Sequence, residues 1–447
     1  MPSCATSWDT VVPDSTVRAS PLTSIPSVAT AGRSLTPPEP RRYPVVVTDE
    51  PAPRVVTVPP RAMLGDAVRP TVAEIDLGAI RHNVRAVRAY VRAPVWGVVK
   101  ADAYGHGAGP VAHAMVAAGA EGLCVALVEE GLELRRAGIL APILVMSGIY
   151  RDALDDALAA GLTPVIYDPS QIERLAARTA ATPIHLKVDT GMARLGIVPA
   201  ELEATARRLR GMAHVQIDGL MTHFASADLD DPSFTHEQLR RFSDAATVLR
   251  TAGLSWRVQH AANSAGAFRF SAGRFDFVRT GIVLYGVAPF PHDGPALLPA
   301  FRFRTEITAL REVPSGATVG YGGAYRCGQP TVVATIPVGY ADGYFRRLSS
   351  DAEVLVRGAR ARVVGNVSMD MAMLDVTRIA KSTGVTVGDE VVLIGSQRGP
   401  AGSDTVRAEE IASRVGTIPY EVLCAVSRRV PRSFRNATEQ AGEGNAP

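Results

Sequence analysis

The 447-residue sequence predicts a TIM-like (β/α)8 barrel followed by a mainly β domain. Three observations predict this fold class. Short β-branched runs alternate with helical segments up to residue 296, and beyond that point the chain changes to short strands and turns. Apolar residues make up 47% of the chain and charged residues only 20%, which supplies enough hydrophobic material for two packed domains.

Changes in composition set the expected boundaries. Residues 1–68 are rich in proline, serine, threonine and valine without a sustained period, which predicts a disordered leader. The barrel is expected over 69–296, because a short strand and a helix-spaced apolar pattern begin at Val72. The β domain is expected over 297–435, and the polar residues 436–447 are expected to form a flexible tail.

Eight apolar runs are the predicted barrel strands, and many of the helical segments between them end at a glycine. The runs are 95–100 (VWGVVK), 122–127 (GLCVAL), 142–147 (PILVMS), 163–168 (TPVIYD), 184–189 (IHLKVD), 217–224 (IDGLMTHF), 256–260 (WRVQH) and 277–284 (FVRTGIVL). Eight such units are typical of a closed parallel barrel. A doubly wound open sheet is the competing architecture.

Charge and hydropathy exclude several classes of function. The 47 basic and 44 acidic residues leave a formal charge of +3 with no long run of one sign, so we expect no nucleic-acid partner. No apolar stretch approaches the roughly 18 residues of a membrane span, and the N-terminus lacks a signal-peptide core. The four cysteines are scattered, which suits a reducing compartment. The sequence therefore predicts a cytoplasmic protein without a membrane partner.

Lysine is unusually rare. Only Lys100, Lys187 and Lys381 are lysines among the 47 basic residues. An amine can lose its proton when desolvated and then act as a base or nucleophile, whereas a guanidinium cannot. Lys100 and Lys187 lie in apolar strand-like runs, where burying a merely structural cation is costly. The pattern therefore predicts lysine chemistry.

Polar residues gather where five predicted strands end, which is the edge at which such barrels carry their active sites. These residues are Lys100, Lys187, Asp189, His223, His260, Asn263, Ser264 and Arg279. A lone histidine at a strand end is usually a core residue, but this convergence favours a site. Ser264 and the turn at Gly281 lie where many barrels bind a phosphate.

These residues allow two other interpretations. Residues 105–109 (GHGAG), with Glu129 downstream, resemble part of a dinucleotide-binding fingerprint, but the complete G-x-G-x-x-G is absent. The histidines and a carbamylated Lys187 could hold metal ions, but such a site needs a His-x-His or carboxylate cluster at the early strands. The first strand offers Lys100 there, so we expect no metal site.

The segment VVKADAYGHG resembles the cofactor-lysine motif of alanine racemases, which are pyridoxal 5'-phosphate enzymes built from a barrel and a β domain. Further segments follow the family's order between residues 70 and 435. They are AEIDLGAIRHNV, HLKVDTGMARLG, MTHFA, HAANSAG, VRTGIVLYG, VGYGGAY, PVGYADGY, NVSMDM and TIPYEVLC. A match of this extent identifies the chain as a member of that family.

The resemblance implies an enzyme that interconverts L-alanine and D-alanine and supplies D-alanine for peptidoglycan. Lys100 corresponds to the lysine that binds the cofactor and acts as the base on one face of the substrate Cα. Tyr321 resembles the base on the other face, supplied by the second subunit of a homodimer with shared active sites. Inverting a stereocentre by removing and returning a proton requires one such group on each side.

The resemblance also assigns cofactor-binding roles. Arg279 corresponds to the arginine that faces the pyridine nitrogen, where a permanent cation disfavours protonation of that nitrogen and restrains side reactions. His223 and His260 match the histidines that link this arginine to the tyrosine. The residues that hold the cofactor phosphate are expected to be Tyr104, Ser264, Gly281 and Ile282.

Substrate contacts follow in the same way. Arg194 resembles the arginine that meets the cofactor's phenolic oxygen and the substrate carboxylate, assisted by Met369 of the partner subunit. Lys187 aligns with a lysine that is often carbamylated and that would then orient Arg194. The residues that resemble those of the substrate entrance are Tyr340, Arg346 and Asp370.

The chain departs from the family pattern at two positions. Arg428 in SRRVPR replaces a tyrosine that reaches the phosphate in many relatives, and Asn366 replaces an arginine of the substrate channel in some. A racemase of broader specificity therefore stays open. A cofactor carrier without catalysis would need neither the β domain nor Tyr321, and a metal-dependent hydrolase would be colourless when purified.

Overall fold

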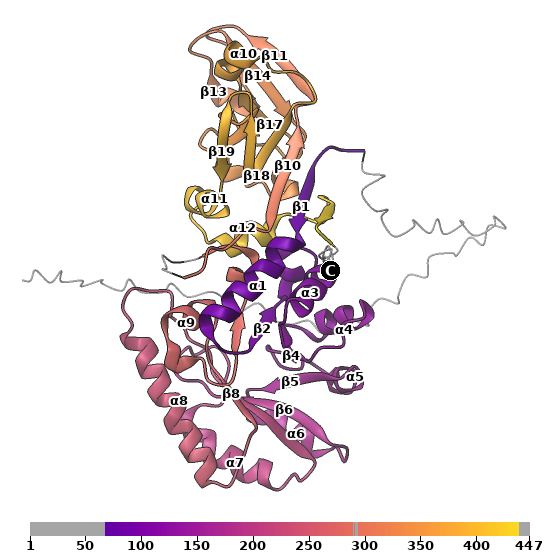
Figure 1. The fold of residues 1–447 in the computed structure, drawn as a ribbon, viewed down its shortest axis with the longest axis vertical. Helices are drawn as coiled ribbons and strands as arrows, with labels where there is room; N and C mark the ends of the chain where they lie inside the picture. The colour runs from indigo at the N-terminus through magenta and orange to yellow at the C-terminus, as the bar shows by residue number, and fades with distance from the viewer. Residues whose placement is uncertain (1–67, 289, 291–293, 438–447) are drawn as a thin grey trace, which may run out of the picture. The chain divides into compact units, whose positions relative to one another are not determined.

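The computed structural model describes residues 68–288, 290 and 294–437 (Figure 1). The chain divides into Met1–Pro59 and Pro60–Pro447, and every described residue belongs to the second unit. The predicted leader lies outside the described residues except for Val68, and the predicted tail lies outside them except for Asn436 and Ala437.

Eight parallel strands form the predicted barrel, which confirms this part of the fold class. They are β2 (Val95–Val98), β3 (Gly122–Val125), β4 (Ile143–Val145), β5 (Leu162–Ile166), β6 (Thr182–Lys187), β7 (Val215–Met221), β8 (Val258–His260) and β9 (Val278–Thr280). They neighbour one another in chain order from β2 to β8, and β9 pairs with β2. Two backbone hydrogen bonds cross the remaining seam, from Asp276 to Gln259 (3.1 Å) and from Arg279 to Ala262 (3.0 Å). A doubly wound open sheet is therefore excluded.

Helices follow the barrel strands as the glycine and capping signals predict. They are α1 (Leu77–Val91), α2 (Lys100–Gly105), α3 (Ala108–Ala117), α4 (Val128–Arg136), α5 (Leu154–Ala159), α6 (Pro169–Ala176), α7 (Leu202–Arg210), α8 (Ser233–Thr251) and α9 (Ser264–Arg269), with short 3-10 turns η2 (Pro199–Glu201), η3 (Ser271–Gly273) and η4 (Ile282–Tyr285). Helix α6 shows the cause clearly, since the Asp168 side chain caps its N-terminus and Pro169 occupies its first position.

The β domain contains a long, mostly antiparallel sheet. Its strands are β10 (Phe301–Glu306), β11 (Ala309–Val313), β14 (Thr331–Ile336), β15 (Glu353–Val356), β16 (Ala359–Val364), β17 (Ala372–Asp375), β18 (Glu390–Gly399), β19 (Gly402–Val406) and β20 (Arg432–Arg435), and β12 (Thr318–Val319) pairs with β13 (Tyr325–Arg326) in a small second sheet. The helices are α10 (Thr377–Thr383), α11 (Ala408–Val415) and α12 (Pro419–Ala425), and the 3-10 turns are η5 (Tyr321–Gly323), η6 (Tyr340–Asp342) and η7 (Arg346–Leu348). A mainly β domain is thus confirmed.

One strand lies in a different sheet from the one that its position predicts. Strand β1 (Val72–Asp76) falls within the range assigned to the barrel, yet it pairs antiparallel with β10 and parallel with β20. Sheet membership depends on backbone partners hundreds of residues away, which a local apolar pattern does not encode. The barrel strands begin at β2, and β1 is part of the large sheet of the β domain.

Asn83 joins helix α1 to both parts of the chain. Its buried side-chain amide donates to the carbonyl oxygens of Leu284 (3.1 Å) and Leu298 (2.8 Å) and accepts from the Leu298 amide (2.8 Å). Leu284 lies in η4, directly after the predicted phosphate-binding turn, and Leu298 leads into β10. A fully satisfied buried amide of this kind fixes the turn in place.

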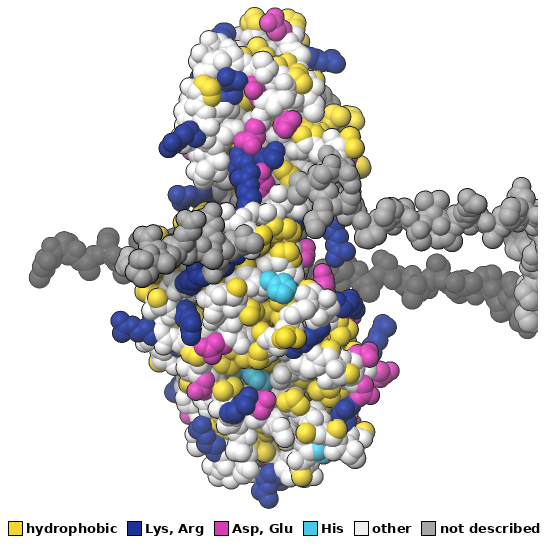
Figure 2. All heavy atoms as spheres, turned by 45° about the vertical axis from the view of Figure 1, so that its right-hand side comes forward, with side chains coloured by type: hydrophobic (Ala, Val, Ile, Leu, Met, Phe, Trp, Pro, Cys, Tyr) yellow, Lys and Arg dark blue, Asp and Glu magenta, His cyan; other side chains and the backbone are white. Residues whose placement is uncertain are grey.

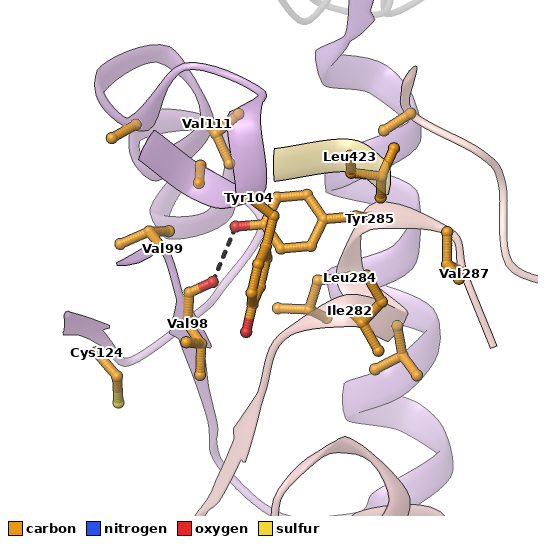
Figure 3. Close-up of a cluster of buried hydrophobic side chains, with 14 of the residues drawn as sticks. Val98, Val99, Tyr104, Val111, Cys124, Ile282, Leu284, Tyr285, Val287 and Leu423 are labelled. Atoms are coloured by element: carbon orange, nitrogen blue, oxygen red, sulfur yellow. Dashed lines mark hydrogen bonds between the residues drawn. The ribbon is translucent and has the colours of Figure 1, made fainter. Parts of the chain in front are cut away.

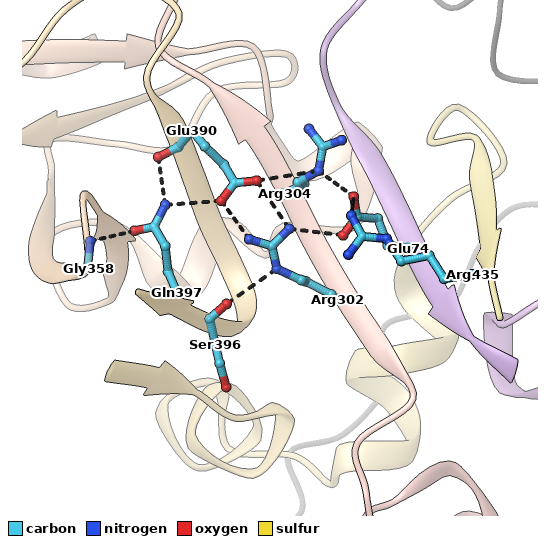
Figure 4. A network of polar contacts seen from close by, with 8 residues as sticks. All are labelled: Glu74, Arg302, Arg304, Gly358, Glu390, Ser396, Gln397 and Arg435. Carbon is cyan, nitrogen blue, oxygen red and sulfur yellow. Dashed lines mark hydrogen bonds and ion pairs between the residues drawn. The ribbon is translucent and has the colours of Figure 1, made fainter. Parts of the chain in front are cut away.

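Charged side chains of both signs are interspersed on the face shown in Figure 2. One buried carboxylate lies on β1, where the Glu74 side chain is only 4% exposed. Its carboxylate accepts from Arg302 Nη1 (2.9 Å) and Arg304 Nε (2.7 Å), and it also binds Arg435 (Figure 4). Burial by itself raises the pKa of Glu74, but the hydrogen bonds from Arg304 and Arg302 outweigh burial and lower it.

We expect Glu74→Gln to reduce the free energy of unfolding by about 2 kcal/mol at neutral pH, because the arginines then lose their buried counter-charge. A carboxyl whose pKa is lowered in the folded state adds stability above its unfolded pKa of roughly 4.3, and that stability is lost as the pH falls. Urea unfolding of wild type and variant should therefore converge at acid pH. Glu312→Gln on the exposed face of β11 is the control, and equal stability of Glu74→Gln and wild type at neutral pH would contradict the role of Glu74.

Candidate active site

The predicted site residues of the barrel lie at or just after the ends of their strands. Lys100 follows β2, Lys187 ends β6, His260 ends β8 and Arg279 lies in β9. His223 follows β7 by two residues. Hydrogen bonds join Arg279 to both histidines, and the charges of Lys100 and Lys187 act on His223. The structure therefore brings these five residues into one cluster.

An unusual backbone conformation follows Lys100. Residues Ala101–Tyr104, which belong to the segment labelled α2, all have left-handed φ values, between 51° and 53°, and none of them is glycine. Such a conformation costs roughly 1–2 kcal/mol per residue, so surrounding contacts must enforce it. Gly105 continues the turn at φ 79°, and a Cβ there would lie 2.5 Å from the Leu423 carbonyl oxygen. The motif KADAYGHG is thus the sequence of a left-handed turn that ends against α12.

Two carboxylates hold this turn at its ends. The Ala101 amide donates to Glu130 Oε1 (2.7 Å), and the Ala108 amide donates to Asp102 Oδ1 (2.7 Å). Glu130 was not among the sequence-predicted site residues. The available signal was its place at the third position of α4, where a glutamate can cap a helix, but Leu127 precedes the helix instead of a serine or threonine.

Tyr104 turns inward from the left-handed turn and is only 6% exposed. Its ring meets Tyr285 (5.0 Å between centroids) and Tyr420 (5.7 Å) edge to face, and Figure 3 shows it beside Ile282 and Tyr285. Burial raises the pKa of Tyr104, so its hydroxyl keeps its proton and can donate a hydrogen bond.

Gly281 faces this hydroxyl. A Cβ on Gly281 would lie 2.5 Å from Tyr104 Oη, so only glycine lets the two groups approach. The Gly281 amide donates to Ser264 Oγ (2.9 Å), and Asn263 caps the helix that Ser264 begins. The residues predicted to bind a phosphate are therefore adjacent in space and offer hydroxyl and amide donors.

Arg279 is a fully buried cation. Its Nη2 donates to the Thr222 and Ala261 carbonyl oxygens, both at 2.9 Å, and to His223 Nδ1 at 3.2 Å. Its Nη1 donates to His260 Nδ1 at 2.5 Å. Among the described residues, its Nε has no hydrogen-bond partner. Burial lowers the pKa of Arg279 to about 10, so the guanidinium is still charged at neutral pH.

These contacts determine the protonation of the histidines. A guanidinium only donates hydrogen bonds, so His260 Nδ1 and His223 Nδ1 must be acceptors and their protons lie on Nε2. His260 Nε2 then donates to His185 Nδ1 at 2.8 Å. Burial, reinforced by the charge of Arg279, lowers the pKa of His185 to about 3 and those of His223 and His260 well below the usual range. All three imidazoles are therefore neutral.

His185 was missed in the sequence because it lies within β6 instead of at its end. Its ring packs on Gly219 of β7, where a Cβ would lie 2.5 Å from His185 Nδ1. The Phe277 ring stacks on the His260 ring, with 4.2 Å between their centroids. Gly219, which faces His185, makes room for the ring. The pairing of the two residues is known only once the register of β6 and β7 is known, so it could not be predicted from the sequence.

Arg194 lies in the exposed loop after β6, and its charge acts on both Lys100 and Lys187. Burial and then Arg194 lower the pKa of Lys187 to about 8. Burial and Arg194 also lower the pKa of Lys100, while the Glu130 carboxylate acts in the opposite direction. Both amines are thus more readily deprotonated than an exposed lysine.

Gln238 of α8 fixes the loops after β6 and β7, and it too was missed. Its Nε2 donates to Thr190 Oγ1 (3.0 Å) and to the His223 carbonyl oxygen (3.1 Å), and its Oε1 accepts from the Ala225 amide (2.9 Å). One buried amide therefore links the loop that carries Arg194 to the strand end that carries His223. No polar signal in the sequence distinguished it from other residues of an amphipathic helix.

The predicted β-domain residues are exposed. Tyr321 is 76% exposed, Met369 52% and Tyr340 42%. Asn366 Nδ2 donates to the Tyr321 carbonyl oxygen (2.9 Å), and Asp370 pairs with Arg429 (2.7 Å). Arg346 begins η7, and Arg428 is exposed before β20.

The described residues contain no group of three or more histidine, cysteine, aspartate or glutamate side chains arranged to hold a metal ion. Within the same residues, none of the helices has the length and apolar character that a bilayer crossing requires.

Both parts of the chain match known family models. Residues 75–289 match the model of the alanine racemase N-terminal domain, and residues 300–434 match that of the alanine racemase C-terminal domain. An alanine racemase of Sorangium cellulosum (strain So ce56) is 48% identical over 380 residues, which cover 82% of this chain and 100% of the relative. An alanine racemase of Symbiobacterium thermophilum is 43% identical over 382 residues, with 83% and 99% covered.

Solved structures agree in fold as well as in sequence. The alanine racemase of Streptomyces coelicolor A3(2) aligns with a TM-score of 0.77 at 35% identity and covers 83% of this chain and 100% of its own. The Bacillus anthracis alanine racemase, solved with bound L-Ala-P, aligns with a TM-score of 0.76 at 35% identity, with 83% and 96% covered. With the barrel, the β domain and the motif order all in agreement, the chain belongs to the alanine racemase family.

Proposed function

We propose that the protein interconverts L-alanine and D-alanine with pyridoxal 5'-phosphate, and that its D-alanine serves peptidoglycan synthesis in the cytoplasm. The observation that carries the proposal is the buried Arg279 guanidinium, whose Nε has no partner among the described residues. The relatives described above are named alanine racemases, so alanine is the proposed substrate.

The residues present fit this cofactor. Arg279 Nε is a buried donor that has no acceptor within the described part of the chain, and a pyridine nitrogen would supply one. Tyr104, Ser264 and the turn at Gly281 and Ile282 offer donors suited to a phosphate. Lys100 provides a desolvated amine for covalent attachment. When bound there, the cofactor withdraws electrons from the substrate and makes its Cα proton removable.

Lys100 is the proposed base on one face of the substrate. Its pKa is lowered by burial and by Arg194, so the neutral amine that accepts a proton is more accessible than in an exposed lysine. Arg194, whose charge acts on Lys100, is the residue proposed to pair with the substrate carboxylate. Both residues act in a cluster whose histidines are neutral, so no imidazolium competes for the substrate's charge.

Arg279 is proposed to keep the cofactor's ring nitrogen unprotonated. Four donated hydrogen bonds and full burial hold the guanidinium in one orientation, and its pKa of about 10 keeps it charged. A fixed cation facing that nitrogen disfavours a second positive charge there. Arg279 would thereby limit charge delocalisation into the ring and favour return of the proton to Cα over side reactions.

The proposed second base is Tyr321 of the partner subunit. In a single chain, the Tyr321 side chain is 76% exposed on the β domain. Met369 and Tyr340 are exposed on the same domain. A two-fold dimer would bury such residues and place them at the site of the other chain, with Met369 beside Arg194 and with Tyr340, Arg346 and Asp370 at the substrate entrance.

We expect Lys100→Ala to lower racemisation at least about a thousandfold, because it removes both the covalent attachment point and one base. The purified wild-type enzyme should have a visible absorption band, and borohydride reduction with peptide mapping should place the cofactor on Lys100. Lys381→Ala in exposed α10 is the matched control and should behave as wild type. Cofactor trapped on Lys187, or a colourless protein sensitive to chelators, would contradict the assignment.

Lys187 is expected to be carbamylated. A free ammonium would repel Arg194, whereas a carbamate forms a charge-assisted pair with it, and a pKa of about 8 leaves a useful fraction of neutral amine. Protein equilibrated with ¹³C-bicarbonate should show a carbamate carbon resonance that Lys187→Ala abolishes. The variant should lose activity and regain part of it with added short carboxylates. Full activity in Lys187→Ala would disprove the role.

Shared sites can be tested by mixing two inactive variants, Lys100→Ala and Tyr321→Phe, under conditions that exchange subunits. About half of the dimers should then be mixed, and each mixed dimer has one site with both lesions and one with neither. Activity should recover to about a quarter of wild type. No recovery after verified exchange would show that Lys100 and Tyr321 do not come from different subunits.

A further inference from the structure

We propose that Glu130 is a positioning residue for Lys100: its carboxylate holds the Ala101 amide and thereby the left-handed turn that aims the lysine amine. This inference rests on the proposed function of Lys100. Glu130 lies in α4, outside the strand ends that supply the other residues of the site.

The geometry of the carboxylate shows how one residue can join two barrel units. Glu130 Oε2 accepts from the Ala126 amide (2.7 Å) and the Leu127 amide (3.1 Å), which fixes it at the start of α4. Its Oε1 remains to accept from the Ala101 amide (2.7 Å). Since β2 and β3 are neighbours in the barrel, Glu130 bridges the ends of adjacent strands.

The left-handed turn requires such a contact. Four successive non-glycine residues at positive φ are unfavourable, and Lys100 immediately precedes them. The Ala103 amide donates to the Val99 carbonyl oxygen (2.9 Å), so the turn has backbone support two residues after its start. At its start, the Ala101 amide depends on Glu130 alone among the described residues. A hydrogen bond to a carboxylate is stronger than one to a neutral acceptor.

Glu130 also acts on the charge of Lys100. The groups that influence the lysine are Arg194, Glu130, Cys424 and Cys124, and Glu130 opposes the effects of burial and Arg194 on its pKa. Loss of the carboxylate charge should therefore lower the pKa of Lys100 further, in addition to freeing the turn. These two consequences can be separated, because the pKa of Lys100 depends on the charge of residue 130, whereas the hold on the turn depends on the length of its side chain.

The first experiment measures amide hydrogen exchange of the full-length protein without cofactor, in peptides covering residues 96–107. Glu130→Gln keeps the length of the side chain but removes its charge, and Glu130→Asp keeps the charge but shortens the reach. Both should speed exchange at the turn about tenfold. Glu129→Gln, the exposed neighbour on the same helix turn, is the control and should match wild type.

The second experiment uses the enzyme loaded with pyridoxal 5'-phosphate. Both Glu130 variants should lower kcat about tenfold and change KM for alanine less than about twofold, because Lys100 is misplaced while Arg194 is retained. Only Glu130→Gln should also shift the pH midpoint of the visible absorption band downward. Glu129→Gln should alter neither quantity.

The outcomes separate this proposal from the proposed function. If borohydride fails to trap the cofactor on Lys100 in wild type, the proposed function is wrong. If trapping succeeds and Glu130→Asp matches wild type in exchange and kcat, positioning by reach is overturned, whatever Glu130→Gln does. Should Glu130→Gln fail to fold, Glu130→Asp carries the test, since it keeps the capping charge of α4.

Discussion

The protonation of the site depends on one buried cation. The two terminal nitrogens of Arg279 contact two carbonyl oxygens and two imidazole nitrogens. A guanidinium can donate hydrogen bonds but cannot accept them. The tautomers of His223 and His260 follow from that constraint, and the orientation of the His260 to His185 hydrogen bond follows from the tautomer. Among the described residues, Nε is the only nitrogen of this guanidinium without a hydrogen-bond partner, and it is the atom to which we propose that an acceptor from outside the chain binds.

Burying such a cation without a carboxylate is costly, and its surroundings are built to accept it. Carbonyl oxygens from the ends of β7 and β8 supply partial negative charge, and aromatic Phe277 stacks on the histidine that receives the shortest bond. The barrel places these groups together because its strand ends converge at one edge. Gln238 and Asn83 then fix the neighbouring loops from helices on the outside of the barrel.

The turn after Lys100 illustrates a second constraint, which is local strain enforced by tertiary contacts. Its left-handed residues are held by carboxylates at both ends, while Gly105 lets the backbone approach α12. Strain of this kind persists only where the surroundings determine it, and here the strained residues connect Lys100 to the buried Tyr104. The β domain contributes to the site through α12, and β1 anchors that domain to the beginning of the barrel segment.

Local patterns predict the barrel, the mainly β domain and the strand-end residues from Lys100 to Arg279, because alternating apolar runs and rare lysines can be recognised within short segments. The sheet that β1 joins depends on tertiary packing, since its partners are more than two hundred residues away along the chain. The same holds for His185, Gln238 and Glu130. Each acts through a register or loop contact, and such contacts exist only after distant segments have packed.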